Sequence, residues 1–81
     1  VIADFDIQVY PNPAKENIFI KFSEIPRTGI KLYLYNLQGK AVFQKISEKQ
    51  EERIYVQHLA PGLYFLQIGR SKSRIYKVLI E

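Results

Sequence analysis

Apolar and polar residues alternate along most of this 81-residue chain, and alternation with a period of two is typical of half-buried β-strands. Ile18, Ile20 and Phe22 fall on one face of a strand in this pattern. Residues 63–68 are largely apolar on both faces, which is typical of a strand in the middle of a sheet. The pattern predicts strands near residues 5–10, 17–23, 30–36, 40–46, 53–58, 62–69 and 73–80.

About seven short strands separated by turns predict an all-β fold, a sandwich of two antiparallel sheets. A five-stranded oligonucleotide-binding barrel is the main alternative for a chain of this length. Residues 47–52 have a helical composition but are too few and too charged to form a stable helix. The predicted core consists of Ile18, Ile20, Leu32, Leu34, Val56, Phe65 and Leu79.

Proline, glycine and asparagine mark the turns between these strands. Pro11 and Pro13 lack backbone N–H groups, so no sheet ladder continues through them. We expect the side-chain oxygen of Asn12 to accept a hydrogen bond from a backbone N–H just beyond it, as in an Asx turn. Residues 36–39 predict a hairpin turn that ends on a left-handed glycine, and residues 60–63 predict a type II turn.

The length and composition indicate a single domain over residues 1–81, whose hydrophobic core carries the fold. Hydrophobic residues make up 47% of the chain, and cysteine is absent, so neither a disulfide nor a thiolate metal site contributes. Because the chain starts at Val1 without methionine, we expect a fragment from the C-terminal end of a longer protein. The net charge of +4 permits an anionic partner without requiring one.

Residues suited to catalysis are sparse. His58 is the only histidine and follows an amphipathic strand, so a structural role is favoured over that of a catalytic base. No calcium-loop motif frames the carboxylates, and a solvated position is predicted for Asp4, Asp6, Glu48, Glu51 and Glu52. The sequence therefore predicts no enzyme activity, no catalytic residue, no metal site and no cofactor.

A basic and aromatic set of side chains is predicted on the outside of the strands. If the aliphatic residues of these strands point inward, the outward residues are Phe19, Lys21, Lys31, Tyr33, Tyr35, Arg53 and Tyr55. Such a set can simply flank a small core, or it can dock a protein or a carbohydrate. Stacking of single-stranded nucleic acid is the less favoured alternative.

Four motifs in a fixed order carry a resemblance to a known family. They are Tyr10-Pro11-Asn12-Pro13-Ala14, then Leu32-Tyr33-Leu34-Tyr35-Asn36 with Gly39-Lys40-Ala41-Val42, then the run from Leu59-Ala60-Pro61-Gly62-Leu63-Tyr64 to Ile68, and finally Tyr76-Lys77-Val78-Leu79-Ile80. In this order, over about residues 9–81, the chain resembles the C-terminal sorting domain of type IX secretion substrates. It departs from the family at Pro61, where a polar residue is frequent, and at Glu81, where a basic residue is common.

The resemblance implies an Ig-like β-sandwich that acts as a non-catalytic sorting signal on exported proteins of the Bacteroidetes, a group of Gram-negative bacteria. It implies a cargo domain earlier in the same chain, passage through the periplasm, and delivery to the cell surface or the medium. The implied partners are the type IX translocon, an outer-membrane shuttle protein and a surface sortase that removes the domain, with no nucleic acid. A second copy can pair with the exposed edge of the last strand.

The resemblance also assigns sorting residues, position by position. They are Tyr10, Pro11, Asn12, Pro13, Gly62, Tyr64, Lys77, Val78, Leu79, Ile80 and Glu81. From the residues alone, each of these segments is a corner, a tight turn or a closing strand. We expect the terminal five residues to carry most of the recognition.

Overall fold

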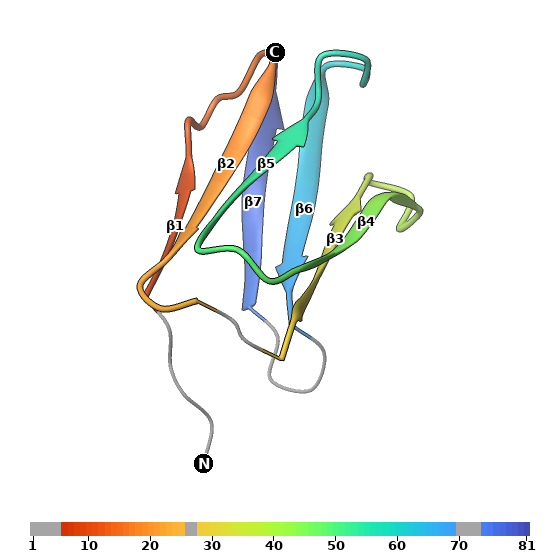
Figure 1. The fold of residues 1–81 in the computed structure, drawn as a ribbon. Helices are drawn as coiled ribbons and strands as arrows, with labels where there is room; N and C mark the ends of the chain where they lie inside the picture. Colours follow the sequence, from red (N-terminus) through yellow and green to blue (C-terminus); the bar gives the residue numbers. More distant parts are fainter. Residues whose placement is uncertain (1–5, 26–27, 70–73) are drawn as a thin grey trace.

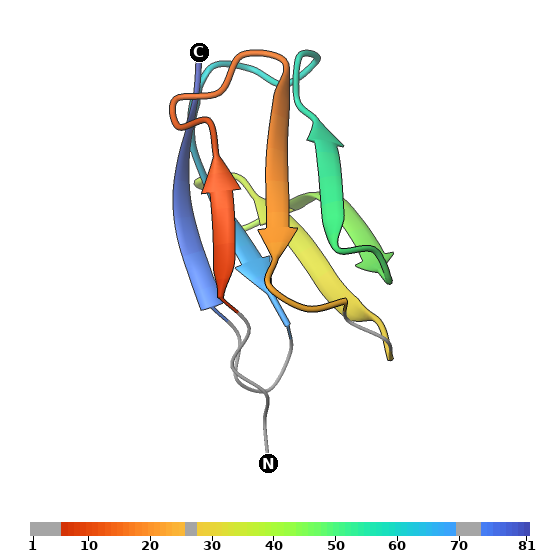
Figure 2. The same cartoon turned by 60° about the vertical axis from the view of Figure 1, so that its left-hand side comes forward.

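The computed structural model describes residues 6–25, 28–69 and 74–81, and these form seven strands in two packed sheets (Figures 1 and 2). The strands are β1 (Ile7–Tyr10), β2 (Asn17–Phe22), β3 (Ile30–Tyr35), β4 (Ala41–Ser47), β5 (Glu51–Tyr55), β6 (Gly62–Ile68) and β7 (Arg74–Ile80). The predicted all-β sandwich is confirmed. The strand predicted to end at residue 69 ends one residue earlier, at Ile68. The predicted strand starts at residues 5 and 73 lie outside the described residues.

The sheets contain three and four strands, and every strand pairing is antiparallel. The order is β1-β2-β5 in one sheet and β4-β3-β6-β7 in the other. β4 therefore extends the sheet of β3, whereas in a constant-type Ig domain the fourth strand joins the first sheet. This arrangement makes β6 a central strand, as its two apolar faces predict, and leaves β7 at an edge.

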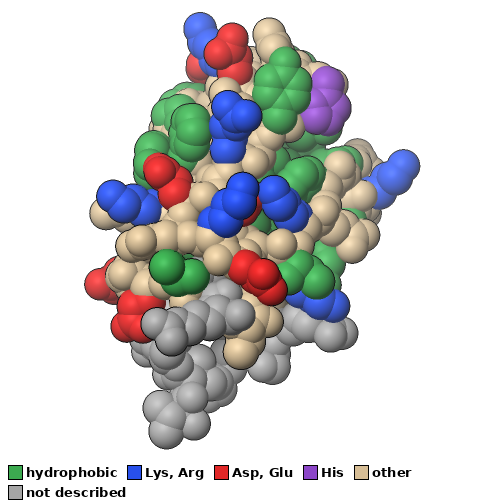
Figure 3. All heavy atoms as spheres, viewed as in Figure 1, with side chains coloured by type: hydrophobic (Ala, Val, Ile, Leu, Met, Phe, Trp, Pro, Cys, Tyr) green, Lys and Arg blue, Asp and Glu red, His purple; other side chains and the backbone are tan. Residues whose placement is uncertain are grey.

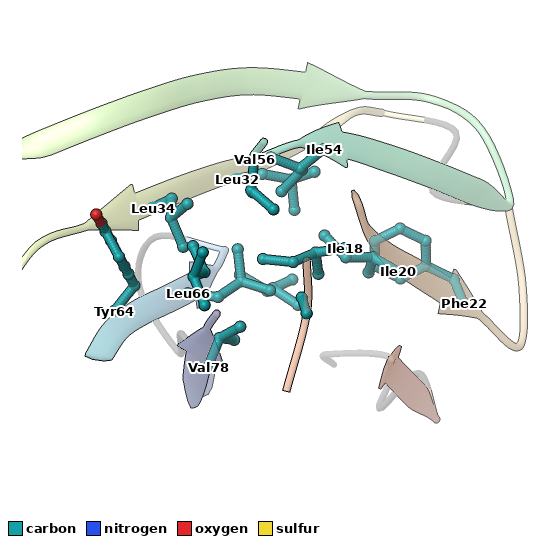
Figure 4. Packing of buried hydrophobic residues seen from close by; sticks show 13 residues of the cluster. Ile18, Ile20, Phe22, Leu32, Leu34, Ile54, Val56, Tyr64, Leu66 and Val78 are labelled. Atoms are coloured by element: carbon teal, nitrogen blue, oxygen red, sulfur yellow. The ribbon is translucent and has the colours of Figure 1, made fainter. Parts of the chain in front are cut away.

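The core lies between the two sheets (Figure 4). Its buried members are Ala14, Ile18, Ile20, Phe22, Leu32, Leu34, Ile54, Val56, Tyr64, Leu66, Ile68, Val78 and Ile80. The predictions for β2, β3 and Val56 are confirmed. Those for Phe65 and Leu79 are wrong, because β6 buries Tyr64, Leu66 and Ile68 instead, and Leu79 is 43% exposed. Both β6 and β7 are apolar on two faces, so alternation alone does not identify the inward one.

One predicted turn is confirmed and another is displaced. The side-chain oxygen of Asn36 accepts hydrogen bonds from the N–H groups of Gln38 and Lys40, and Gly39 has a φ of 83°. Before β6, however, the hydrogen-bonded turn runs from Val56 to Leu59, with the Leu59 N–H donating to the Val56 carbonyl at 3.0 Å. The fifth strand accordingly ends at Tyr55, earlier than predicted.

A buried carboxylate connects the two sheets on the side where β4 faces β5. Glu52 is only 4% exposed; one of its oxygens lies 2.6 Å from the Lys45 ammonium, and the other accepts a hydrogen bond from the Ser47 hydroxyl at 3.0 Å. The prediction that Glu52 is solvated is therefore wrong. Burial by itself would raise the pKa of Glu52, but the bonds from Lys45 and Ser47 outweigh burial and hold the pKa below its ordinary value of 4.5.

Acid is expected to weaken the fold through this carboxylate. Because the pKa of Glu52 is lower in the folded chain than in the unfolded chain, its contribution is complete above about pH 5 and is lost as the pH falls through the folded pKa. Melting temperatures measured between pH 7 and pH 3 should fall more steeply for the parent than for Glu52→Gln. Glu24→Gln, which changes an exposed carboxylate, is the control. Parallel curves for parent and Glu52→Gln would contradict the expectation.

Candidate recognition site

The segment after β1 leaves the first sheet and lies against the outer edge of β7 (Figure 2). Ala14 forms a parallel bridge with Ile80: the Ala14 N–H donates to the Leu79 carbonyl, and the Glu81 N–H donates to the Ala14 carbonyl, both at 2.8 Å. Ala14 is fully buried. The N-terminal part of the chain thus covers the final part of an otherwise open strand edge.

Asn12 extends this contact with its side chain. Its amide nitrogen donates to the Lys77 carbonyl at 2.9 Å, and its oxygen accepts from the Leu79 N–H at 3.1 Å. The amide therefore takes the place of a strand residue between two prolines that have no N–H to offer. The Asx turn predicted at Asn12 is wrong, since the donor to its oxygen lies 67 positions away. Both X–Pro peptide bonds of this segment, before Pro11 and before Pro13, are cis.

Gly62 and Tyr64 meet the same part of β7 from its other side. The register places Gly62 opposite Ile80 and Tyr64 opposite Val78. The Tyr64 hydroxyl donates to the Ala60 carbonyl at 2.6 Å, and the ring is 7% exposed. A tyrosine at the start of this strand that bonds back to the preceding corner is a feature of Ig sandwiches. Gly62 has a φ of 149°, and no atom lies within 4 Å of a Cβ built there, so its backbone conformation rather than space favours glycine.

Removing the Tyr64 hydroxyl is expected to destabilise the corner. Tyr64→Phe leaves the Ala60 carbonyl without this donor and should lower the free energy of unfolding by about 1 kcal/mol, a loss of about 4–8 °C in melting temperature. Tyr55→Phe is the matched control, because the Tyr55 hydroxyl bonds only to Gln57 on the exposed surface. Equal melting temperatures for the two variants would contradict a structural role for the Tyr64 hydroxyl.

The predicted sorting residues from three distant segments are therefore brought together around the final half of β7. We call this assembly the β7 latch; it comprises Pro11, Asn12, Pro13, Ala14, Gly62, Tyr64 and residues 77–81. Val78 and Ile80 are buried, whereas Lys77, Leu79 and Glu81 are exposed. A partner that reads the folded domain can touch the exposed residues directly and depends on the buried ones only for their position.

Tyr10 belongs to the neighbouring sheet face rather than to the β7 latch. Its ring stacks on Phe19 at a centroid distance of 5.7 Å, and its hydroxyl donates to Glu51 at 2.7 Å. This hydrogen bond to a carboxylate is the main cause that raises the pKa of Tyr10. Between Phe19 and the chain end lies a hollow of about 430 Å³, lined by Pro11, Pro13, Lys15, Glu16, Asn17, Phe19 and Glu81.

The predicted basic and aromatic set does not form one surface. Because β2 and β5 lie in one sheet and β3 in the other, the outer face of the first sheet carries Phe19, Lys21, Arg53 and Tyr55. The opposite side of the sandwich carries Lys31, Tyr33 and Tyr35. On the first sheet, basic, acidic and hydrophobic side chains are interspersed (Figure 3). Whether either group docks a partner stays a prediction.

Two contributions were missed from the sequence. Ala14 was noted only as part of a motif, although its small side chain lets the backbone lie fully buried against β7. The alternation Ile75, Lys77, Leu79 was visible in the sequence, but the outward orientation of these residues was not, because both faces of β7 are apolar.

Among the described residues, no group of three or more His, Asp or Glu side chains is arranged to hold a metal ion, and no helix has the length and hydrophobicity to cross a membrane.

Comparison with known proteins shows one family and solved structures with a similar fold. The family model of the secretion system C-terminal sorting domain matches residues 8–81. None of the curated proteins matches. A solved structure with a similar fold is that of PorZ, an essential surface component of the type-IX secretion system of Porphyromonas gingivalis, with a TM-score of 0.76 and 18% sequence identity. The similarity covers 93% of this chain but 11% of that one, and at this identity it shows the fold alone.

Proposed function

This chain belongs to the secretion system C-terminal sorting domain family, and from that premise we propose that it directs an attached cargo protein across the outer membrane through the type IX secretion system. In this proposal the domain is an address and performs no catalysis. The observation that carries it is the β7 latch, because three separate motif segments come together around β7 only in the folded chain.

The proposed route begins with the cargo domain and this domain in the periplasm as one chain. The translocon and its outer-membrane shuttle protein then read the folded domain, and a surface sortase removes it, leaving the cargo on the cell surface or in the medium. A signal read in the folded state needs a backbone of defined shape. Two hydrogen bonds from Asn12 and two at Ala14 supply it on one edge of β7, and pairing with β6 supplies it on the other.

A fusion experiment tests this function. The domain is attached to the C-terminus of an unrelated periplasmic reporter in a bacterium that has a type IX system, and surface reporter is measured by protease accessibility on intact cells. We expect surface delivery with the domain attached. The same fusion in a strain without the translocon is the control and should stay in the periplasm. A reporter retained in the periplasm of the competent strain would refute the proposal.

The terminal charges offer a test that separates recognition from folding. Lys77→Ala with Glu81→Ala changes two exposed side chains, so stability should stay within about 0.5 kcal/mol of the parent. We expect the melting temperature to be kept and the fused reporter to remain in the periplasm. The matched control, Lys40→Ala with Glu24→Ala, removes the same charges elsewhere on the surface. Delivery at the parent level would move the signal to residues 11–13 or to Gly62 and Tyr64.

A binding module that uses the outer faces of the strands is the alternative function. If it bound single-stranded nucleic acid, the affinity of the isolated domain for an oligonucleotide should fall steeply as salt rises. We expect no such binding, because the structure divides the basic and aromatic residues between opposite sides of the sandwich. Salt-sensitive oligonucleotide binding together with failed reporter delivery would favour the alternative.

A further inference from the structure

Tyr10 is the only predicted sorting residue outside the β7 latch, and its position in the chain connects it to the latch. It is the last residue of β1, and directly after it the chain leaves the first sheet for the edge of β7 (Figure 2). Asn12, which bonds to Lys77 and Leu79, follows two positions later. The place where Tyr10 is held therefore limits where the Asn12 amide can lie.

Two contacts hold the Tyr10 side chain on the outer face of the first sheet. Its ring stacks on Phe19 with a centroid distance of 5.7 Å and an angle of 23° between the ring planes, and its hydroxyl donates to the Glu51 carboxylate at 2.7 Å. Phe19 lies on β2 and Glu51 on β5, so the contacts of this side chain connect all three strands of the sheet. We call Tyr10, Phe19 and Glu51 the Tyr10 anchor.

The backbone of β1 provides little hold of its own at this point. The strand has four residues and lies at the edge of its sheet, where it pairs with β2. Pro11 follows Tyr10 directly and has no N–H to continue the ladder. Short segments held by few hydrogen bonds are the first parts of a domain to open locally. The two contacts of the Tyr10 anchor therefore act at the end of β1 that opens most readily.

Phe19 joins the Tyr10 anchor to the β7 latch a second time. It lines the hollow of about 430 Å³ together with Pro11, Pro13 and Glu81, which are all members of the latch. The anchor and the latch are therefore neighbours in the folded domain as well as in the sequence.

Direct contact between Tyr10 and a partner is the competing explanation for its place among the sorting residues. The side chain is 38% exposed, but its hydroxyl is bonded to Glu51 and its ring is stacked on Phe19. A partner that bound the hydroxyl would displace a hydrogen bond to a carboxylate, and such bonds are stronger than those between neutral groups. The geometry therefore favours a role for Tyr10 within the chain.

We propose that Glu51 and Phe19 are positioning residues of the sorting signal. Through Tyr10 they fix the end of β1, and this holds Asn12 and Ala14 against β7. Neither Glu51 nor Phe19 lies in a segment that carries the family resemblance. This inference rests on the proposed function, because the β7 latch is the signal whose geometry the two residues maintain.

Hydrogen exchange of two amide protons near the end of β7 measures this effect on the domain itself. The Leu79 N–H is bonded to Asn12 and the Glu81 N–H to Ala14, so both protons exchange when the segment after β1 opens. Glu51→Ala removes one contact of the Tyr10 anchor and should speed both exchanges about tenfold.

Three further variants show whether the faster exchange comes from the anchor. Tyr10→Phe should match Glu51→Ala, and the double variant should be no faster than either, because the same hydrogen bond is lost only once. Glu51→Gln keeps an oxygen that accepts from the hydroxyl and should restore slow exchange. Asn36→Ala removes two hydrogen bonds in the β3–β4 turn, so it lowers the stability of the whole domain but should leave the Leu79 and Glu81 protons at the parent rate.

Delivery of the reporter fusion separates positioning from direct recognition. Glu51→Ala combined with Phe19→Leu removes both contacts but leaves Tyr10 available to a partner. We expect this combined variant to fold and to deliver severalfold less reporter than the parent. Glu48→Ala, which removes an exposed carboxylate from the β4–β5 connection, is the control and should deliver at the parent level. If the combined variant does not fold, Glu51→Ala alone takes its place in both measurements.

Each outcome decides the inference. Unchanged exchange in Glu51→Ala, or equal acceleration by Asn36→Ala, refutes the link between the anchor and the latch and leaves the proposed function standing. Delivery at the parent level by the folded combined variant refutes positioning, and failure of Tyr10→Ala in the same assay then assigns Tyr10 to direct recognition. Failure of the parent fusion refutes the proposed function and the inference with it.

Discussion

Leu66→Ala is expected to lower the free energy of unfolding by about 3–4 kcal/mol. Leu66 is fully buried on the central strand β6, where it packs between the two sheets, and truncation there leaves a cavity that strands on both sides prevent from closing. A domain of this size has about 5–10 kcal/mol of stability in total. Urea unfolding monitored by circular dichroism should therefore show a midpoint reduced by a third or more.

The neighbouring residue provides the control for Leu66→Ala. Phe65 lies one position earlier on β6 and faces outward, so Phe65→Ala should cost about 1 kcal/mol although more atoms are removed. If Phe65→Ala were the more destabilising variant, the assignment of the inward face of β6 would be reversed.

Asn12→Ala is expected to reduce surface delivery by about tenfold or more, the largest functional effect of a single side chain in the β7 latch. The substitution removes a donor to Lys77 and an acceptor for Leu79 and should cost about 1–2 kcal/mol of stability, which leaves the domain folded. The edge of β7 then keeps only its two bonds to Ala14, and the Lys77 carbonyl and the Leu79 N–H lose their partner, so the backbone of the terminal residues is held less firmly. Surface protease accessibility and a thermal melt measure the two effects separately.

Asn36→Ala is the matched control for Asn12→Ala. Asn36 is likewise near the surface and also makes two hydrogen bonds through its side chain, but both remain within the β3–β4 turn. The two variants should lose similar stability, and only Asn12→Ala should lose delivery. Equal delivery by both would mean that the β7 latch only stabilises the fold. Asn12→Asp, which keeps the acceptor and loses the donor, should fail like Asn12→Ala because its carboxylate faces the Lys77 carbonyl.

The parts of the fold that could be predicted from the sequence are those governed by neighbours along the chain. Alternation predicted the strands and the inward residues of β2 and β3, where the outward residues are polar or tyrosine. It was wrong at Phe65 and Leu79, where both faces of the strand are apolar and only the register with other strands determines which one is buried. The burial of Glu52 was missed because its partner Lys45 lies on a strand of the other sheet.

The site shows the same division. Pro11 and Pro13 correctly predicted a break in the sheet, because that effect comes from their own backbone. The partner of Asn12 could not be predicted, because local hydrogen bonding is the usual behaviour of asparagine and its true partners follow some 65 positions later. Likewise, the basic and aromatic set was predicted without knowing which sheet each strand joins, and the observed topology divides its residues between the two sheets.

The span of the β7 latch also means that its hydrogen bonds form only when nearly the whole domain is folded. Asn12 and Lys77 are 65 positions apart, so almost the entire domain forms the tether that keeps these two groups at high local concentration. A proteolytic nick in a connecting loop cuts that tether, and the packing of the core between the two sheets is then what keeps Asn12 beside β7.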